Sequence, residues 1–360
     1  MFLHIMHNDK FNEPFIEFIE RKFNIEEHCF IFIGGESEEK IKIVKRKNTV
    51  VASKEMLKKE GLSKLFKMLK PYFKESDKVF LHGLFTPQVV LFLMLNSKFA
   101  AKTSWIVWGA DLYYKVTRKI SWKSNLYEFV RKSAIKKLQN IITLTPGDYS
   151  IVKEWYNTKA NEQFGMYINP VKKEYLDSIK PEEKKEVYIQ IGNSADRSNN
   201  YFEIIDMLEK YKNENIKIFA PVSYGDKKYA LEVKEYGEKK LGDKFVAMLD
   251  FMTPEKYTAF LGSIDIVIFN HKRQQGLGNL YALLYLGKKV YIRSDISSWH
   301  FFEELFGIKV YDSLKIKELE FNEFKENSKE ISEKNKIMAG KFYSDDYIAE
   351  VWSKIFNEKS

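Results

Sequence analysis

The 360-residue sequence is poor in cysteine and in long apolar runs. Its single cysteine, Cys29, can form neither an internal disulfide nor a metal site of several thiolates, which fits a reducing compartment. The thiol lies in the apolar run 29–33, so we expect it to be buried in a strand, as free cysteines usually are. No run approaches the roughly 20 apolar residues that a membrane-spanning helix needs, and residues 1–6 lack a basic leader. We therefore expect a cytoplasmic protein that is at most peripheral to a membrane.

Several motifs that bind nucleotides or metals are also absent. The sequence has no GxxxxGK[ST] loop, no GxGxxG, no Asp-X-Asp triplet and no cluster of His and Cys. An Asp-X-Asp triplet would supply the carboxylate oxygens that hold a divalent ion under a diphosphate. We therefore expect no metal, so that the charge of a phosphate group would be met by helix dipoles, backbone N–H groups and cationic side chains.

The positive charge lies in the first half of the chain. The formal net charge is +9, and residues 1–170 carry 28 Lys and Arg against 18 Asp and Glu, whereas the remainder carries 31 against 32. A solvated lysine-rich surface and attraction to phosphate or anionic lipid both explain this asymmetry. No nucleic-acid recognition motif accompanies it, so we expect no nucleic-acid partner. Two basic amphipathic stretches, 54–74 and 118–137, are expected to pack on a sheet, although a basic face against anionic lipid is also compatible.

The apolar residues present, 44% of the chain, suffice for two domains. Short apolar runs alternate with longer amphipathic segments, which is typical of parallel α/β layers. We expect strands at 2–7, 29–33, 79–82, 104–108, 141–145 and 164–168 in the first half, and at 187–191, 216–220, 245–248, 264–269 and 289–292 in the second. Helices are expected between them, for example at 13–23, 54–73, 201–211, 254–261 and 279–286.

Two prolines and the charged run 180–186 interrupt this pattern between the halves, which indicates a linker. We predict an α/β protein with two Rossmann-like domains and a cleft between them: an N-terminal domain over 1–170, a linker over 171–186 and a second domain over 187–344. A C-terminal helix over 345–360, with apolar residues at helical spacing, can pack back on the N-terminal domain.

The strongest local signal is the segment 192–200, between an expected strand and an expected helix. In open α/β sheets ligands bind beyond the carboxyl ends of strands, and a helix N-terminus offers free N–H groups to a phosphate. Gly192 would permit close backbone approach, Asn193 and Ser194 can hydrogen-bond, and Asn199 can cap the helix. An ordinary strand-to-helix turn of small capping residues explains the same segment.

A second such loop, 270–279, follows the strand that ends at Phe269. Arg273 can bind a diphosphate bidentately, and Gly276 and Gly278 would expose backbone N–H groups at the helix start. A solvated basic loop is the alternative, and for a third loop at 221–226 a plain turn is the simpler interpretation. The residues that we predict to bind a nucleotide are Gly192, Asn193, Ser194, Asp196, Arg197, Asn199, Pro221, Tyr224, Asn270, Arg273, Gln274, Gln275, Gly276, Gly278 and Asn279.

Two first-half loops carry an aspartate after an expected strand, Asp9 and Asp111. Either carboxylate could act as a general base or bind acceptor hydroxyls, and either could equally be a helix N-cap. We favour Asp9 as the base and Asp111 for binding. The further residues predicted to bind an acceptor are His7, His82, Trp108 and Tyr113, although the apolar run around His82 also fits a core histidine.

Together these motifs resemble a known family. The segments 82–87, 108–113, 192–199 and 273–278 stand in the order and at the spacing of the 4-alpha-L-fucosyltransferase-like enzymes of enterobacterial common antigen synthesis. These enzymes transfer N-acetylated 4-amino-fucose from a TDP-sugar to a lipid-linked disaccharide. The resemblance runs over most of the chain.

What the resemblance implies is a GT-B glycosyltransferase, with the donor held mainly by the second domain and the acceptor by the first. The implied partners are a TDP- or UDP-sugar, which is a co-substrate rather than a cofactor, a lipid-diphosphate-linked saccharide and the anionic cytoplasmic face of the cell membrane. A two-domain nucleotide-sugar epimerase and a non-catalytic sugar-nucleotide-binding protein remain alternatives.

The chain departs from the family pattern in the loops that would hold the donor. Ala195 stands where glycine is more frequent, Asn279 where threonine is expected, and Asp295 where glutamate is expected. The loop before Arg273 is one residue longer, with His271 and Lys272. These differences leave the sugar and the nucleotide base open, but not the class of reaction.

Overall fold

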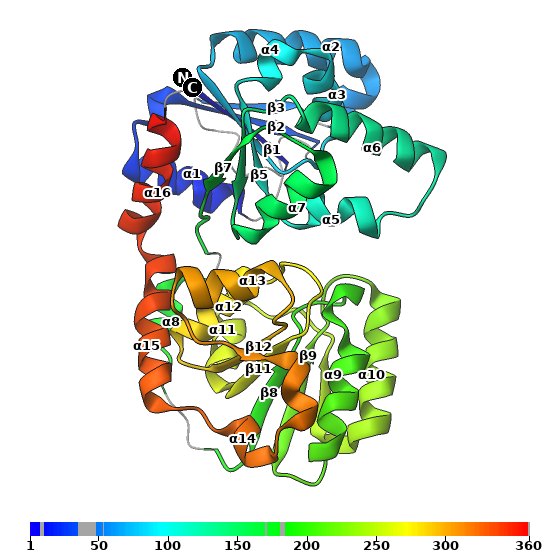
Figure 1. Cartoon of the computed structure of the whole chain (residues 1–360), viewed down its shortest axis with the longest axis vertical. Coiled ribbons are helices and arrows are strands. Elements are labelled where there is room, and N and C mark those ends of the chain that lie inside the picture. Colours follow the sequence, from blue (N-terminus) through cyan, green and yellow to red (C-terminus); the bar gives the residue numbers. More distant parts are fainter. Residues whose placement is uncertain (8–10, 35–47, 53, 170, 181–183, 359–360) are drawn as a thin grey trace. The chain divides into compact units, whose positions relative to one another are not determined.

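The computed structural model describes residues 1–7, 11–34, 48–52, 54–169, 171–180 and 184–358, with the backbone alone for 54–60. The chain forms two compact units, each built on a parallel sheet covered by helices (Figure 1). Unit 1 contains Met1–Ile168 and Ser344–Ser360, and unit 2 contains Asn169–Tyr343. Each unit is described by itself.

Unit 1 has a seven-stranded sheet in the order β3-β2-β1-β4-β5-β6-β7, in which all neighbouring strands are parallel. The strands are β1 (Phe2–His7), β2 (His28–Ile33), β3 (Thr49–Ala52), β4 (Lys78–His82), β5 (Thr103–Val107), β6 (Asn140–Thr143) and β7 (Asn161–Phe164). The helices are α1 (Asn12–Lys22), α2 (Lys54–Glu75), α3 (Pro87–Leu95), α4 (Ser97–Ala100), α5 (Ala110–Thr117), α6 (Trp122–Ile135), α7 (Gly147–Tyr156) and α16 (Asp345–Asn357).

The central strands of unit 1 are buried and largely apolar because helices cover both faces of the sheet. Every residue of β2, β4 and β5 is buried, Cys29 among them as expected. On one face α16 packs beside α1 (Figure 1), where Trp352 lies 5.1 Å from Phe15 between ring centroids. Lys78 Nζ donates to Ile355 O and Phe356 O, both at 3.0 Å, so a cation meets the carbonyl end of α16.

Unit 2 has a six-stranded parallel sheet in the order β10-β9-β8-β11-β12-β13. Its strands are β8 (Val187–Ile191), β9 (Ile216–Pro221), β10 (Phe245–Met248), β11 (Ile266–Phe269), β12 (Lys289–Ile292) and β13 (Tyr311–Asp312). Its helices are α8 (Lys173–Asp177), α9 (Tyr201–Leu208), α10 (Lys227–Leu241), α11 (Pro254–Ser263), α12 (Leu277–Tyr285), α13 (Ser297–His300), α14 (Phe321–Lys325) and α15 (Lys329–Gly340).

Both sheets follow one order: the third, second and first strands of the unit, then the fourth, fifth and sixth. This is the doubly wound Rossmann order, which confirms the predicted fold class. The order reverses between β1 and β4 in unit 1 and between β8 and β11 in unit 2. At such a switch point the flanking loops leave the sheet in opposite directions and open a crevice at the carboxyl ends of the strands.

Some sequence-based expectations for the elements were wrong. A strand was expected at 164–168, but β7 is Asn161–Phe164 and the apolar residues that follow lie outside the sheet. Polar residues form this strand because it lies at the edge of the sheet, where charged and polar side chains are common. The strands β3 and β13 were not predicted, and α8 lies within the segment expected to be a linker.

Candidate functional site

Unit 2 brings three loops together at the carboxyl end of its sheet. The loops 192–200, 222–226 and 270–276 follow β8, β9 and β11. Because the strand order reverses between β8 and β11, the first and third loops flank the switch point, where open α/β sheets bind ligands. The second loop joins the first through a hydrogen bond of 2.8 Å from Ala195 N to Tyr224 O.

Asn199 holds the first loop in shape from the inside. Its side chain is fully buried, and its Oδ1 accepts hydrogen bonds from Asn193 N at 2.9 Å and from His271 Nε2 at 2.8 Å. Its Nδ2 donates to Ser194 O at 3.1 Å and to Asp196 O at 2.9 Å. The amide of this predicted nucleotide-binding residue is therefore committed to the loop itself.

His271 is a residue of the site that the sequence reasoning missed. Its burial, and after that the positive charge of Arg273, lower the pKa of His271 to about 3, so the ring is neutral. The facing oxygen of Asn199 also accepts from a backbone N–H, so the His271 proton lies on Nε2. The sequence signal that could have identified His271 was its place just after the strand that ends at Phe269. In the sequence, His271 drew notice only because the loop is one residue longer than in the family.

The first and third loops are bound to each other by further side-chain contacts. Ser198 Oγ donates to Gln275 Oε1 at 2.6 Å. Asn200 Nδ2 donates to Asn270 O at 2.8 Å. Together with the bond between Asn199 and His271, these contacts make the two loops one preorganised surface at the switch point.

Two glycines are required for this arrangement. Gly192 has φ +58°, and a Cβ there would lie 2.5 Å from the ring of Tyr201, which is buried and donates to Pro221 O at 3.1 Å. Gly276 has φ +71°, and its Cβ would lie 3.0 Å from Asn193 Nδ2. Both backbones adopt the left-handed region that side chains disfavour, and both approach a neighbour closely.

The N-terminus of α12 is the part of this surface best suited to an anion. Gly276 is its N-cap, no described side chain caps it, and its first turn holds no acidic residue. Asn279 N already donates to Gly276 O at 3.0 Å, and the helix dipole adds partial positive charge to this end of α12. Arg273, which is half-buried, lies three residues ahead of this cap.

Asp196 shows that positive charge reaches the first loop. Burial raises the pKa of the Asp196 carboxyl, but the hydrogen bonds from Ser198 and the charge of Arg273 more than offset this and lower it. Beside it, the exposed Arg197 forms an ion pair with Glu232 at 3.1 Å. These groups form the outer rim of the predicted nucleotide site.

The other predicted nucleotide-binding residues divide into a framework and an accessible set. Asn270 is fully buried, donates to Glu203 Oε2 at 2.9 Å and accepts from Ser313 Oγ at 2.8 Å, so its side chain supports the loop. Gly278 O accepts from Asn169 Nδ2 at 2.9 Å. Gln274 is buried, whereas Tyr224 is half exposed. The residues with part of their surface open to solvent are Asp196, Arg197, Tyr224, Arg273, Gln275, Gly276, Gly278 and Asn279.

In unit 1, Asp111 lies at the start of α5 and is 2% exposed. Its Oδ1 accepts from the backbone N–H of Trp108 at 2.9 Å and its Oδ2 from Leu84 N at 3.0 Å and Trp105 Nε1 at 2.7 Å. Burial raises the pKa of this carboxyl, and the hydrogen bonds and the charge of Arg131 reduce that effect. A carboxylate with its lone pairs filled in this way is suited to hold the loop, not to accept a proton from a substrate. Of the roles considered for it, the geometry favours the structural one.

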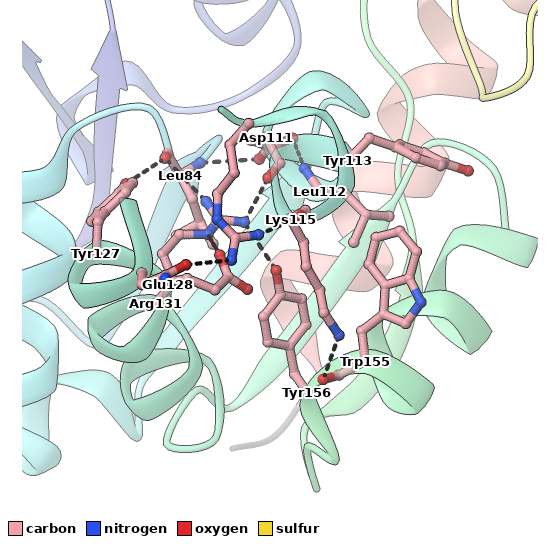
Figure 2. Close-up of polar contacts among 12 residues, drawn as sticks. Leu84, Asp111, Leu112, Tyr113, Lys115, Tyr127, Glu128, Arg131, Trp155 and Tyr156 are labelled. Carbon is pink, nitrogen blue, oxygen red and sulfur yellow. Dashed lines mark hydrogen bonds and ion pairs between the residues drawn. The ribbon is translucent and has the colours of Figure 1, made fainter. Parts of the chain in front are cut away.

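Arg131 completes this buried network, as Figure 2 shows. Its side chain comes from α6, is fully buried and donates from Nη2 to Asp111 O at 2.5 Å. It also pairs with Glu128 at 3.2 Å. Tyr127, on the same side of α6, donates to Leu84 O at 3.1 Å. The network joins α6 to the ends of β4 and β5.

His82 belongs to the interior of unit 1. The ring is 3% exposed and shares a 3.0 Å hydrogen bond with His4, which shares another of 3.0 Å with His28. Its second nitrogen contacts the hydroxyl of Tyr167. Burial lowers the pKa of His82 to about 3. These contacts favour the core interpretation over acceptor binding.

Three other predicted acceptor residues lie near the carboxyl ends of the strands in unit 1. Trp108 packs against Tyr167 at 4.4 Å between ring centroids, and its indole N–H has no hydrogen-bond partner among the described residues. His7 ends β1, next to the switch point, and Tyr113 lies in α5. Asp9, the favoured candidate base, lies outside the described residues.

Solved structures share this fold over nearly the whole chain. A glycosyltransferase from Rickettsia africae has a TM-score of 0.67 at 14% identity, covering 99% of both chains. Sucrose-phosphate synthase from Thermosynechococcus elongatus has 0.68 at 10% identity, covering 99% of this chain and 98% of the other. A UDP-forming trehalose-phosphate synthase from Burkholderia xenovorans has 0.64 at 11%, covering 98% and 97%. At such identities the likeness shows the fold alone, which is GT-B.

Among the described residues, no helix is both long enough and apolar enough to cross a membrane. Residues 5–359 match the family described as 4-alpha-L-fucosyltransferase glycosyl transferase group 56. This match confirms the resemblance drawn from the motifs and decides for a transferase over an epimerase or a non-catalytic binding protein. The chain therefore belongs to the 4-alpha-L-fucosyltransferase family and is a glycosyltransferase of GT-B fold.

Proposed function

We propose that this glycosyltransferase transfers an amino-deoxy sugar of the N-acetylated 4-amino-fucose type from a TDP- or UDP-sugar to a lipid-linked saccharide. Transfer would need no metal and would take place at the cytoplasmic face of the cell membrane. The observation that carries the proposal is the switch point of unit 2, where the uncapped N-terminus of α12 follows Arg273 in the loop after β11.

The donor diphosphate is the group that this surface would bind. The first N–H groups of α12 carry partial positive charge, and a guanidinium can bind two phosphate oxygens at once. When the sugar leaves, negative charge grows on the diphosphate, so the same groups stabilise the transition state more than the ground state. The contacts of Asn199 and His271 hold these donors in place before the substrate arrives.

We propose that unit 1 binds the acceptor at its own switch point, between β1 and β4. His7 and Trp108 would contact acceptor groups there, and Tyr113 remains a candidate. Asp9 follows the end of β1 by two positions in the sequence and is our candidate for the base that takes the proton of the acceptor hydroxyl. We no longer propose that Asp111 and His82 contact the acceptor, because their polar atoms form hydrogen bonds inside unit 1.

Arg273→Ala tests the donor site, with Lys272→Ala as a matched control. Both changes remove one cation from the same loop, but Lys272 is exposed. Arg273→Ala should weaken TDP or UDP binding by about 1.5–3 kcal/mol, the range for a hydrogen bond to a charged group, with little change in melting temperature. Isothermal titration calorimetry would measure the binding. The assignment of the donor site is wrong if Arg273→Ala binds TDP or UDP as tightly as the unaltered protein does. The proposal that no metal is needed is wrong if EDTA abolishes transfer and magnesium restores it.

A further inference from the structure

The end of α5, the turn that follows it and the outer side of α6 expose a group of large apolar side chains. Ile120 is 86% exposed, Trp122 71% and Phe129 64%, and Val116 and Leu126 are also exposed. In α6, residues 122, 126 and 129 follow helical spacing and so share one side of the helix. We call these five residues the apolar patch. Apolar side chains gathered in this way mark an interaction surface, whereas single exposed ones do not.

The opposite side of α6 is anchored, so the helix cannot turn to bury the apolar patch. Arg131 is fully buried and donates to Asp111 O, while Tyr127 donates to Leu84 O (Figure 2). Rotation of α6 would leave the buried guanidinium without its partners, which is strongly unfavourable. The exposure of the patch is therefore a stable property of unit 1.

The turn before α6 is equally well defined. Ser121 Oγ accepts from Ser124 N at 3.1 Å, and Ser124 Oγ donates to Lys119 O at 2.8 Å. Arg118 Nη2 donates to Asn125 Oδ1 at 3.2 Å. In Figure 1 this turn and the start of α6 extend away from the sheet of unit 1. Ile120 and Trp122, the two most exposed members of the apolar patch, therefore lie in the part of unit 1 that projects from the sheet.

Lysines outnumber acidic groups in the segment that carries the apolar patch. The exposed lysines in and next to α6 are Lys119, Lys123, Lys132 and Lys136. Residues 112–147 carry a single carboxylate, Glu128, and it is paired with Arg131. Lysine stems can lie along apolar surface while their ammonium groups reach outward, and tryptophan prefers the boundary between apolar and wet surroundings. This combination is typical of helices that lie in the headgroup region of an anionic bilayer.

We propose that the apolar patch and its lysines dock unit 1 on an anionic phospholipid leaflet. The side chains of the turn and of the outer side of α6 would enter the headgroup boundary, and the lysines would bind lipid phosphates. A second copy of the chain fits poorly, because a two-fold contact would place these lysines against their own copies. The inference deepens the proposed function, since a lipid-linked acceptor would be met at this surface.

Flotation with vesicles that lack any acceptor tests the docking separately from catalysis. The full-length protein should float with phosphatidylcholine–phosphatidylglycerol vesicles, less with phosphatidylcholine alone, and less as NaCl screens the charges. Replacing Ile120, Trp122 and Phe129 together by serine should lower the partition coefficient by about tenfold or more. Phe251 and Ile337 are similarly exposed in unit 2, at 81% and 71%. Replacing this pair by serine is the matched control and should leave flotation unchanged.

Insertion itself can be followed with phospholipids brominated on the acyl chain. They should quench part of the tryptophan fluorescence, and Trp122→Phe should remove that part while still binding. The proposal is overturned if the protein does not float with anionic vesicles, if the triple variant floats as well as the control, or if light scattering shows a dimer that the triple variant dissociates. Binding of TDP or UDP by the triple variant tests the proposed function separately, so the two failures are distinguishable.

Discussion

The Oδ1 of Asn199 accepts a hydrogen bond of 2.8 Å from Nε2 of His271, although the two residues are 72 positions apart in the chain. Neither side chain is open to solvent. The pair joins the loop after β8 to the loop after β11 and thereby determines the shape of the candidate donor site. We regard both as positioning residues, because their polar atoms bind the protein rather than a ligand.

His271→Phe should separate positioning from simple folding. The ring stays apolar and similar in size, but Asn199 loses one of its two donors. We expect a loss of about 0.5–1.5 kcal/mol in stability from the lost hydrogen bond, together with weaker binding of TDP or UDP. His271→Asn, whose amide can still donate, should recover part of the nucleotide affinity. Calorimetric titration and thermal melting measure the two effects, and equal affinity in both variants would refute a positioning role.

Gly276→Ala tests the close packing at the N-terminus of α12. An alanine there takes a left-handed backbone conformation, which costs roughly 1–2 kcal/mol, and its Cβ presses on Asn193. Gly307→Ala is the control, since Gly307 has φ +59° and no atom within 4 Å of its would-be Cβ. Both variants should melt at lower temperature, but only Gly276→Ala should lose affinity for the nucleotide. Similar nucleotide affinity in the two variants would show that the loop tolerates the extra methyl group.

The two aspartates of unit 1 should behave in opposite ways. Asp111→Asn places an amide N–H against a group of donors, so we expect a lower melting temperature and a loss of about 1–3 kcal/mol. Asp9→Asn should leave melting unchanged and lower turnover by about 10²–10⁴-fold if Asp9 is the base. Turnover and melting curves for both variants decide this. An Asp9→Asn enzyme that keeps more than about a tenth of its turnover would remove Asp9 from the chemistry.

The buried histidines should make unit 1 sensitive to acid. Burial lowers the pKa of His82 to about 3 and of His28 to about 4, from 6.5. Below pH 6.5 the unfolded chain takes up protons that the folded chain does not, so stability is full above that pH and falls as pH decreases toward about 3. For His82 alone the loss at pH 5 is about 2 kcal/mol.

Melting temperatures at pH 7.5 and pH 5 measure this effect. His82→Gln should show a smaller drop between the two conditions than the unaltered protein does. His300→Gln, which changes an exposed histidine in unit 2, should show the full drop. If His82→Gln shows the full drop as well, protonation of His82 does not limit stability in acid.

The order of strands and loops along the chain was decided by local sequence. Apolar runs bounded by polar turns located most of the central strands, because strands covered on both faces are largely apolar. The weakly patterned edge strands β3, β7 and β13 were missed or misplaced for the same reason: an edge strand is only partly buried, and its sequence need not be apolar. The motifs at 82–87, 108–113, 192–199 and 273–278 together also indicated the family, since they record which residues stand in the loops and in what order.

Tertiary structure alone decided which of those residues remain available to a ligand. Sequence pattern placed Asp111 at a strand end, but only the folded chain brings Arg131, Trp105 and Leu84 around it. Likewise, the sequence marked 118–137 as a basic, amphipathic stretch, yet sequence alone cannot say which side of a helix faces the core when both sides carry apolar or aromatic residues. The buried Arg131 makes that choice for α6 and leaves Trp122 and Phe129 outside. Which side chains remain exposed depends on contacts between segments that are distant in the chain. The energies of these contacts cannot be read from a short stretch of sequence.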